Sequence, residues 1–188
     1  MDRALDFLAQ LYTETPWIYL SWPAAVMLLG TLLPVVWKPA TQHLGLTPRS
    51  GPGAVGIATA PFLHANLAHV MANLPPFVGL GSLVLHRDPA RFPEIAGTIL
   101  LATGFAVWVA ARKVVHVGMS GVVFGFLGYL IAAAWFTRDT PDLIVAGGVL
   151  LYYGGMLAGV APVRGSVSWE SHLFGLLVGI GRAWLDLG

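Results

Sequence analysis

The sequence contains no cysteine and few charged residues. None of its 188 residues is Cys, and only 10% are Asp, Glu, Lys or Arg. The lack of cysteine excludes disulfide bonds, thiolate metal sites and a cysteine nucleophile, and a net charge of +1 gives no sign of a nucleic-acid partner. Soluble domains carry about 25% charged residues, whereas this chain is 56% hydrophobic with a mean hydropathy of +0.74. The composition predicts a protein whose solvent is the lipid bilayer.

The few charged residues are spaced so that the runs between them predict membrane-spanning helices. Crossing the hydrocarbon core takes roughly 20 apolar residues in a helix. We expect an all-α, polytopic membrane protein, with a single domain over residues 1–188 and six transmembrane helices at about 16–37, 64–86, 93–112, 117–137, 141–161 and 169–187. The Gly- and Pro-rich stretch before the second helix is expected to be a loop in the interface. Arg182, in the last helix, is expected to extend toward the far interface.

Polar side chains stand near the start of three of these helices. The second helix carries His64, His69 and Asn73, the fourth carries Ser120, and the sixth carries His172. These three helices run in the same direction, so their first turns lie in the same leaflet at similar depth. Because polar groups at membrane depth are costly, this gathering predicts a functional site. A transporter or channel would instead need polar residues along a route across the bilayer.

Glycines predict that the fourth and sixth helices pack closely. At 100° per residue, Gly121, Gly125 and Gly128 lie on one face of the fourth helix. In the sixth helix Gly175 and Gly179 share a face with His172. Small residues at this spacing allow membrane helices to approach each other. If the two faces meet, Ser120 comes within reach of the His172 imidazole.

A serine and a histidine at one depth form a candidate catalytic pair. A hydroxyl becomes a nucleophile when a base takes its proton, so we assign Ser120 as nucleophile and His172 as general base. Glu170 is about 200° around the helix from His172, so we expect it at the solvent mouth and a Ser–His dyad without a carboxylate. Three further histidines near loops are expected to be solvated: His43, His86 and His116. Of these, His116 is near enough to Ser120 in sequence to be a rival base.

Donors for an oxyanion are present in the same set. The Asn73 amide, the His69 imidazole and the backbone N–H of Ser120 can each donate, and Ser120 lies near a helix N-terminus that favours negative charge. Gly118 and Gly121 on either side of the nucleophile let a substrate approach the backbone without a side-chain clash. The sequence has neither the H-E-x-x-H of a zinc protease nor a pair of intramembrane aspartates, and we expect no metal or cofactor.

These residues fall into three motifs whose order resembles that of the rhomboid family. Residues 64–73 read H-x-x-x-x-H-x-x-x-N, residues 118–121 read G-x-S-G, and residues 172–179 read H-x-x-G-x-x-x-G. They occur on the second, fourth and sixth of six helices, as in the compact bacterial form of this family of intramembrane serine proteases. The resemblance implies Ser120 as nucleophile, His172 as base, and His69 with Asn73 at the oxyanion. It also implies a structural role for His64.

The resemblance carries further implications for location and substrate. Lys and Arg divide five to five between the two sides, so charge alone does not orient the chain. The family implies a multi-pass protein of the bacterial inner membrane, with both termini cytoplasmic and an active site that opens outward. Its substrates would be single-span membrane proteins cut in or near the bilayer after a small residue. A loop at about 161–169 would cap the site, and the fifth helix would border lateral access.

Two departures from the family pattern bear on the site. Some members place Tyr four residues after the nucleophile, under the base, where this chain has Phe124; its ring can stack but has no hydroxyl. The first loop also lacks a Trp-Arg pair found in some members. The alternative function is that of a catalytically silent rhomboid-like protein that binds membrane clients. Such proteins typically lose the serine or the histidine, and this chain keeps both.

Overall fold

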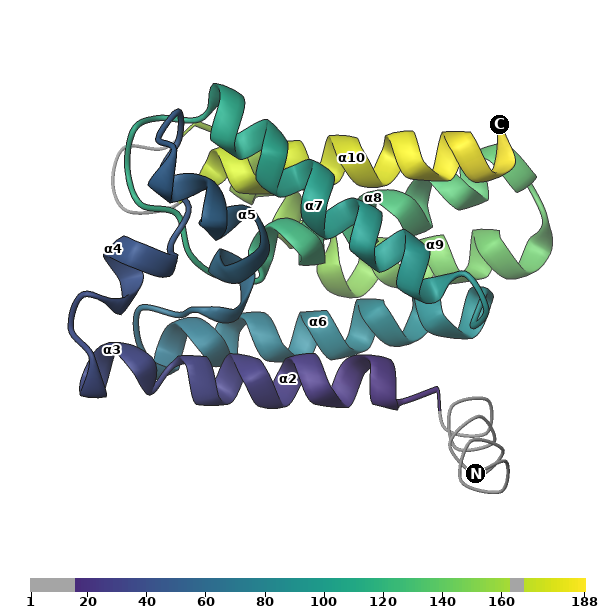
Figure 1. Cartoon of the computed structure of the whole chain (residues 1–188). Coiled ribbons are helices and arrows are strands. Elements are labelled where there is room, and N and C mark those ends of the chain that lie inside the picture. The colour runs from purple at the N-terminus through teal and green to yellow at the C-terminus, as the bar shows by residue number, and fades with distance from the viewer. Residues whose placement is uncertain (1–15, 163–167) are drawn as a thin grey trace, which may run out of the picture.

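The computed structural model describes residues 16–162 and 168–188, and all of their regular structure is helical apart from one isolated β-bridge (Figure 1). The long helices are α2 (Ile18–Gly30), α6 (Leu67–Arg87), α7 (Phe92–Ala110), α8 (Ser120–Thr137), α9 (Thr140–Tyr153) and α10 (Trp169–Leu187). Shorter pieces are α3 (Leu33–Val36), α4 (Ala40–Leu44), η1 (Pro52–Val55), α5 (Gly56–Thr59), η2 (Ala60–Phe62) and η3 (Gly154–Val160). The predicted all-α class is confirmed.

Five segments of the described chain are long and apolar enough to cross a membrane. They are Ile18–Val36, Leu67–Arg87, Phe92–Ala110, Ser120–Thr137 and Thr140–Val160. Together they confirm a multi-pass membrane protein. The sixth predicted span, α10, has 19 residues but carries three charged side chains, and each of these charges is paired with a residue outside α10.

Arg182 does not extend toward the interface as the sequence suggested. It is 8% exposed, and its guanidinium lies 2.7 Å from Glu94 of α7 and 2.9 Å from Asp186 of α10. The prediction was wrong because it considered only the helix that carries Arg182. A buried charge near membrane depth is tolerated when an opposite charge is in contact with it, and α7 supplies one.

Several helix ends differ from the predicted ones for local reasons. The first span is interrupted after Gly30, and α3 begins only at Leu33. The second helix begins at Leu67 rather than 64, because the Asn66 side chain accepts a hydrogen bond from the His69 N–H at 2.8 Å and caps the helix there. His64 therefore precedes the helix. The fifth span ends as the 3₁₀ segment η3, a tighter coil that follows α9.

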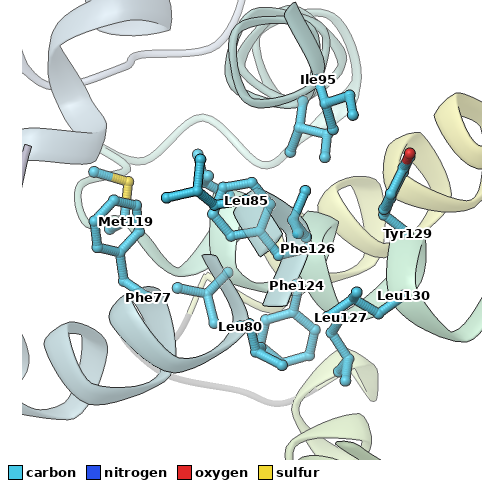
Figure 2. Close-up of a cluster of buried hydrophobic side chains, with 14 of the residues drawn as sticks. Phe77, Leu80, Leu85, Ile95, Met119, Phe124, Phe126, Leu127, Tyr129 and Leu130 are labelled. Carbon is cyan, nitrogen blue, oxygen red and sulfur yellow. The ribbon is translucent and has the colours of Figure 1, made fainter. Parts of the chain in front are cut away.

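The helix α8 forms the centre of the bundle. Its residues are buried on every face from Gly121 to Leu130, as expected for a helix that is apolar all round. Figure 2 shows side chains from α6, α7 and α8 meeting in this core. Phe126 of α8 has ring neighbours in Phe77 of α6, at 6.1 Å, and in Phe92 of α7, at 5.9 Å.

The predicted glycine faces of α8 and α10 do meet. A Cβ atom added at Gly175 would lie 2.0 Å from the carbonyl oxygen of Gly121, and one added at Gly179 would lie 1.9 Å from that of Gly125. A Cβ at Gly128 would lie 2.4 Å from the carbonyl oxygen of Leu176. Backbone therefore contacts backbone along this seam, and side chains at these positions would keep the helices apart.

The helices α6, α8 and α10 all begin at one end of the bundle, as the sequence predicted (Figure 1). At the other end lie the start of α2 and the end of α10 (Figure 1). The first turns that carry the polar residues are thus brought to one end.

Candidate active site

The first turns of α6, α8 and α10 surround a cavity of about 550 Å³. Five of the predicted site residues line it: His69, Asn73, Ser120, Phe124 and His172. Gly118 and Gly121 instead line a smaller neighbouring cavity, and Gly175 lies in the helix seam. The predicted capping loop at 161–169 falls mostly on 163–167, outside the described residues.

Ser120 is the first residue of α8, and the turn before it requires glycine. Gly118 has a φ of 110°, in the left-handed region that L side chains rarely adopt. A Cβ there would also lie 2.8 Å from the Cε1 and Nε2 atoms of His69. The N–H of Gly118 donates to the Ala60 carbonyl at 2.8 Å, and this bond connects the turn to η2. Ser120 therefore stands at a helix N-terminus, where free N–H groups and the helix dipole favour negative charge.

His172 is held on two sides. Its Nδ1 lies 2.9 Å from the carbonyl oxygen of Gly159 in η3. Because a carbonyl only accepts, Nδ1 carries the proton and Nε2 keeps its lone pair. The Phe124 ring stacks on the imidazole, with the ring centroids 4.3 Å apart and the planes 5° from parallel. The imidazole is thus presented as a base whose tautomer is fixed by a main-chain acceptor.

Gly159 is a site residue that sequence reasoning missed. A carbonyl acceptor is a property of every residue, so no residue type marks it. The glycine itself matters here, because a Cβ at this position would lie 3.1 Å from both His172 Nδ1 and Phe124 Cζ. The run of glycines at the end of the fifth predicted helix was the available signal.

Glu170 does not lie at a solvent mouth, which corrects the sequence prediction. Its side chain is 5% exposed and forms an ion pair with Arg112, whose Nη2 is 3.0 Å from the carboxylate. The backbone N–H of Arg112 also points to this carboxylate, at 3.3 Å. The Glu170 carboxylate is thus bound to Arg112 in the loop before α8. The imidazole of His172 is oriented by the Gly159 carbonyl and not by an acid.

His116 is buried, where the sequence predicted solvation. It is 4% exposed, and its Nδ1 lies 2.5 Å from Ser168 Oγ while its Nε2 lies 3.1 Å from the Arg112 carbonyl. Burial lowers the pKa of this imidazole. With both ring nitrogens engaged, His116 is not available as a rival base for Ser120. The other two histidines, His43 and His86, are exposed as predicted.

His64 supports the nucleophile turn from behind. It is fully buried, and its Nε2 faces the Met119 N–H at 3.5 Å. Its ring meets that of His69 edge-on, with the centroids 5.0 Å apart. Burial, and secondarily the neighbouring His69, lowers the pKa of His64 to about 4. This neutral imidazole contacts the turn but does not line the large cavity.

His69 and Asn73 stand one turn apart on α6, at the wall of the cavity. The Ala65 N–H points to His69 Nδ1 at 3.5 Å, so Nε2 is the nitrogen that carries the proton. Asn73 is 5% exposed, and its amide donates to the His69 carbonyl at 2.8 Å. That amide has a second proton, which can serve a ligand in the cavity. Among residues 16–162 and 168–188, no three His, Asp or Glu side chains are grouped to hold a metal ion.

Comparisons with known proteins agree with this architecture. The Rhomboid domain family matches residues 53–188. The uncharacterized protein Rv1337 of Mycobacterium tuberculosis and the uncharacterized protein Mb1372 of Mycobacterium bovis are each 35% identical over 150 residues, or 75% of this chain and 62% of the relative. A rhomboid protein of Acanthamoeba polyphaga mimivirus is 30% identical over 128 residues, which is 63% of this chain and 67% of that protein. The chain thus spans about three fifths of the length of its mycobacterial relatives. Since the domain match extends over most of its residues, the chain belongs to the rhomboid family.

Proposed function

We propose that this protein is an intramembrane serine protease that hydrolyses peptide bonds in or near the transmembrane segments of membrane proteins. The observation that carries the proposal is the state of His172. A carbonyl at 2.9 Å holds its Nδ1 proton and a stacked ring fixes its plane, so Nε2 is left as a proton acceptor in the cavity that Ser120 lines. A nucleophile and an oriented base in one cavity are what acyl transfer requires.

In the proposed reaction Ser120 Oγ attacks the scissile carbonyl carbon and its proton passes to His172 Nε2. The tetrahedral intermediate collapses as the peptide C–N bond breaks, and His172 gives the proton to the leaving amine. Water then attacks the acyl-enzyme, His172 takes a proton from it, and the ester bond to Ser120 breaks as that proton returns to Oγ. General base assistance of this kind contributes about 10²–10⁴ in rate.

The negative oxygen of each tetrahedral intermediate needs donors. The proposed set is the Nε2–H of His69, the free amide proton of Asn73 and the backbone N–H of Ser120, all on the cavity that holds the nucleophile. Loss of one such donor typically costs about 3 kcal/mol of transition-state stabilisation. Asn73→Ala is therefore expected to lower kcat by about a hundredfold while KM changes little. An unchanged kcat would remove Asn73 from the set.

Substrates reach the site through the bilayer in this proposal. Met156 of η3 lines the cavity, and the buried residues of the Thr140–Val160 segment are Asp142, Ala146 and Val149 alone. A transmembrane segment that partly unwinds could therefore enter beside α9 and η3. From the resemblance we place both termini in the cytoplasm and the cavity toward the outer face of a bacterial inner membrane. The substrates are single-span membrane proteins.

The proposal is tested on purified protein in lipid with a fluorophosphonate probe and a transmembrane reporter substrate. Labelling is expected at Ser120 and is lost in Ser120→Ala, and cleavage is lost in both Ser120→Ala and His172→Ala. Ser82→Ala is the matched control, because Ser82 is partly buried on α6, does not line the cavity and bonds only its own helix backbone in the described structure. Wild-type protein that is folded but neither labelled nor active would favour the alternative, a silent protein that binds membrane clients.

A further inference from the structure

A chain of hydrogen bonds outside the proposed mechanism joins the loop before α8 to the start of α10. His116 Nδ1 lies 2.5 Å from Ser168 Oγ, which in turn lies 2.6 Å from Ser171 Oγ. On the other side of the ring, His116 Nε2 lies 3.1 Å from the Arg112 carbonyl. One end of this chain is four residues before Ser120, and the other immediately precedes His172.

The protons in this chain can be assigned from the chemistry of its members. The Arg112 carbonyl only accepts, so His116 Nε2 carries the proton and a neutral ring must accept at Nδ1. Ser168 therefore donates its hydroxyl proton to His116, which leaves its oxygen to accept from Ser171. Each donor has one acceptor. This ordered state requires an uncharged His116, in agreement with its burial.

The loop end of the chain is firmly fixed. The main chain of His116 pairs with Leu46 in both directions, at 2.8 and 3.0 Å, and Gly118 donates to Ala60 at 2.8 Å. These bonds leave the segment between His116 and Ser120 little freedom to move. The side chain of His116 is therefore held in a fixed place relative to Ser120, and so are the groups that bind to it.

The helix end of the chain bears directly on the base. Ser168 is the N-cap residue of α10, and Ser171 packs its carbonyl against α8, 3.3 Å from where a Cβ of Gly121 would stand. A second link runs beside the first, because Arg112 pairs with Glu170 of the same turn. Ser168 and Glu170, at the start of α10, are therefore both bound to the loop that leads into Ser120.

We propose that His116, Ser168 and Ser171 are positioning residues, whose hydrogen-bond chain holds the start of α10 so that His172 faces Ser120. The inference rests on the proposed protease function. Its physical basis is that proton transfer depends steeply on geometry, and a displacement of about 1 Å can lower a rate by about 10²-fold. In this proposal the three residues act through the placement of His172; His116 and Ser168 also line the cavity, with their polar atoms engaged in the chain.

The test compares Ser168→Ala with Ser168→Thr, which keeps the hydroxyl that donates to His116. Ser168→Ala is expected to lower kcat about tenfold with KM within twofold of wild type, and Ser168→Thr to restore most of kcat. Ser82→Ala serves as the control. Ser168→Ala kinetics equal to wild type would overturn the inference, as would a loss that Ser168→Thr does not restore and that parallels a lower melting temperature.

A second measurement does not depend on activity. In protein labelled with ¹⁵N-histidine, His116 is expected to show the neutral tautomer with the proton on Nε2, and His116→Asn identifies its signals. Ser168→Ala should shift the His172 ring signals, because that ring is stacked on Phe124 and senses its own displacement. Unmoved His172 signals, or a proton on Nδ1 of His116, would refute the positioning role. If the wild type proved inactive, the proposed function would fail while these spectra still decided whether the link exists.

Discussion

Gly175→Ala should separate α8 from α10 and thereby damage both stability and the site. The new Cβ would stand 2.0 Å from the Gly121 carbonyl oxygen, whereas ordinary contact begins at 3.4 Å. The obstacle is backbone on a buried helix, so no flexible side chain can move aside. The helices must part by roughly 1 Å, and overpacking of this sort costs about 1–3 kcal/mol.

The matched control for this prediction lies on the same helix. Gly181 has nothing within 4 Å of an added Cβ, so Gly181→Ala meets no obstacle. It should raise helix stability by up to about 1 kcal/mol through propensity alone. Both variants gain the higher helix propensity of alanine over glycine. The difference in stability between them therefore reports the clash at the seam between α8 and α10 alone.

The measurement is thermal unfolding in a fixed detergent, together with the rate at which a fluorophosphonate labels Ser120. A cost of about 2 kcal/mol corresponds to a melting temperature roughly 4–8 °C lower in a chain of this size. Labelling of Gly175→Ala should slow by about 10–100-fold if the pair moves apart by 1 Å. If the melting temperature of Gly175→Ala were equal to or higher than that of Gly181→Ala, the helices would not meet at Gly175.

Three further predictions follow from contacts near the site. Burial lowers the pKa of His64 from 6.5 to about 4 on folding, so the unfolded chain binds more protons between these two values. The contribution of His64 to stability is therefore full above pH 6.5 and declines as the pH falls toward 4, by up to about 3 kcal/mol. His64→Gln should flatten this decline, and a profile of melting temperature against pH that is the same in both proteins would contradict the prediction. Arg112→Ala removes the cation that pairs with the buried Glu170 carboxylate and should lower the melting temperature. Adding Glu170→Gln to that variant should recover most of the loss in a thermal melt, and no recovery would mean that packing of the Arg112 stem dominates. Phe124→Leu removes the ring that stacks on His172, worth about 1 kcal/mol, so kcat should fall severalfold while Phe124→Tyr stays near wild type, and equal activity of all three proteins would deny the ring a role.

Features set by local periodicity could be predicted from the sequence. The shared depth of the first turns follows from helix direction, and the seam follows from glycines spaced along one face of each helix. Both need only the geometry of single helices. The resemblance added the family, which the domain match bears out, while the chemical roles of Ser120 and His172 remain proposals.

Features that depend on a partner far away in the chain could not be predicted. Glu170, His116 and Arg182 were placed in solvent or at the interface because each was considered on its own helix or loop. Their partners are 58, 52 and 88 residues away. A charged or polar side chain is buried or exposed according to whether such a partner exists, and pattern within one helix carries no information about it.

The main-chain acceptor at Gly159 has a consequence for how this site would look to a mutational survey. Replacing side chains one at a time would find the serine, the histidine and the Phe124 ring that stacks on it, but not the acceptor of the Nδ1 proton, since no substitution deletes a carbonyl. That acceptor would go unnoticed. Replacing the amide between Gly159 and Val160 by an ester, by protein semisynthesis, would weaken that carbonyl as an acceptor without changing any side chain. The strength of the hydrogen bond between His172 and Gly159 can therefore be varied by a change in the backbone but not by an ordinary amino-acid substitution.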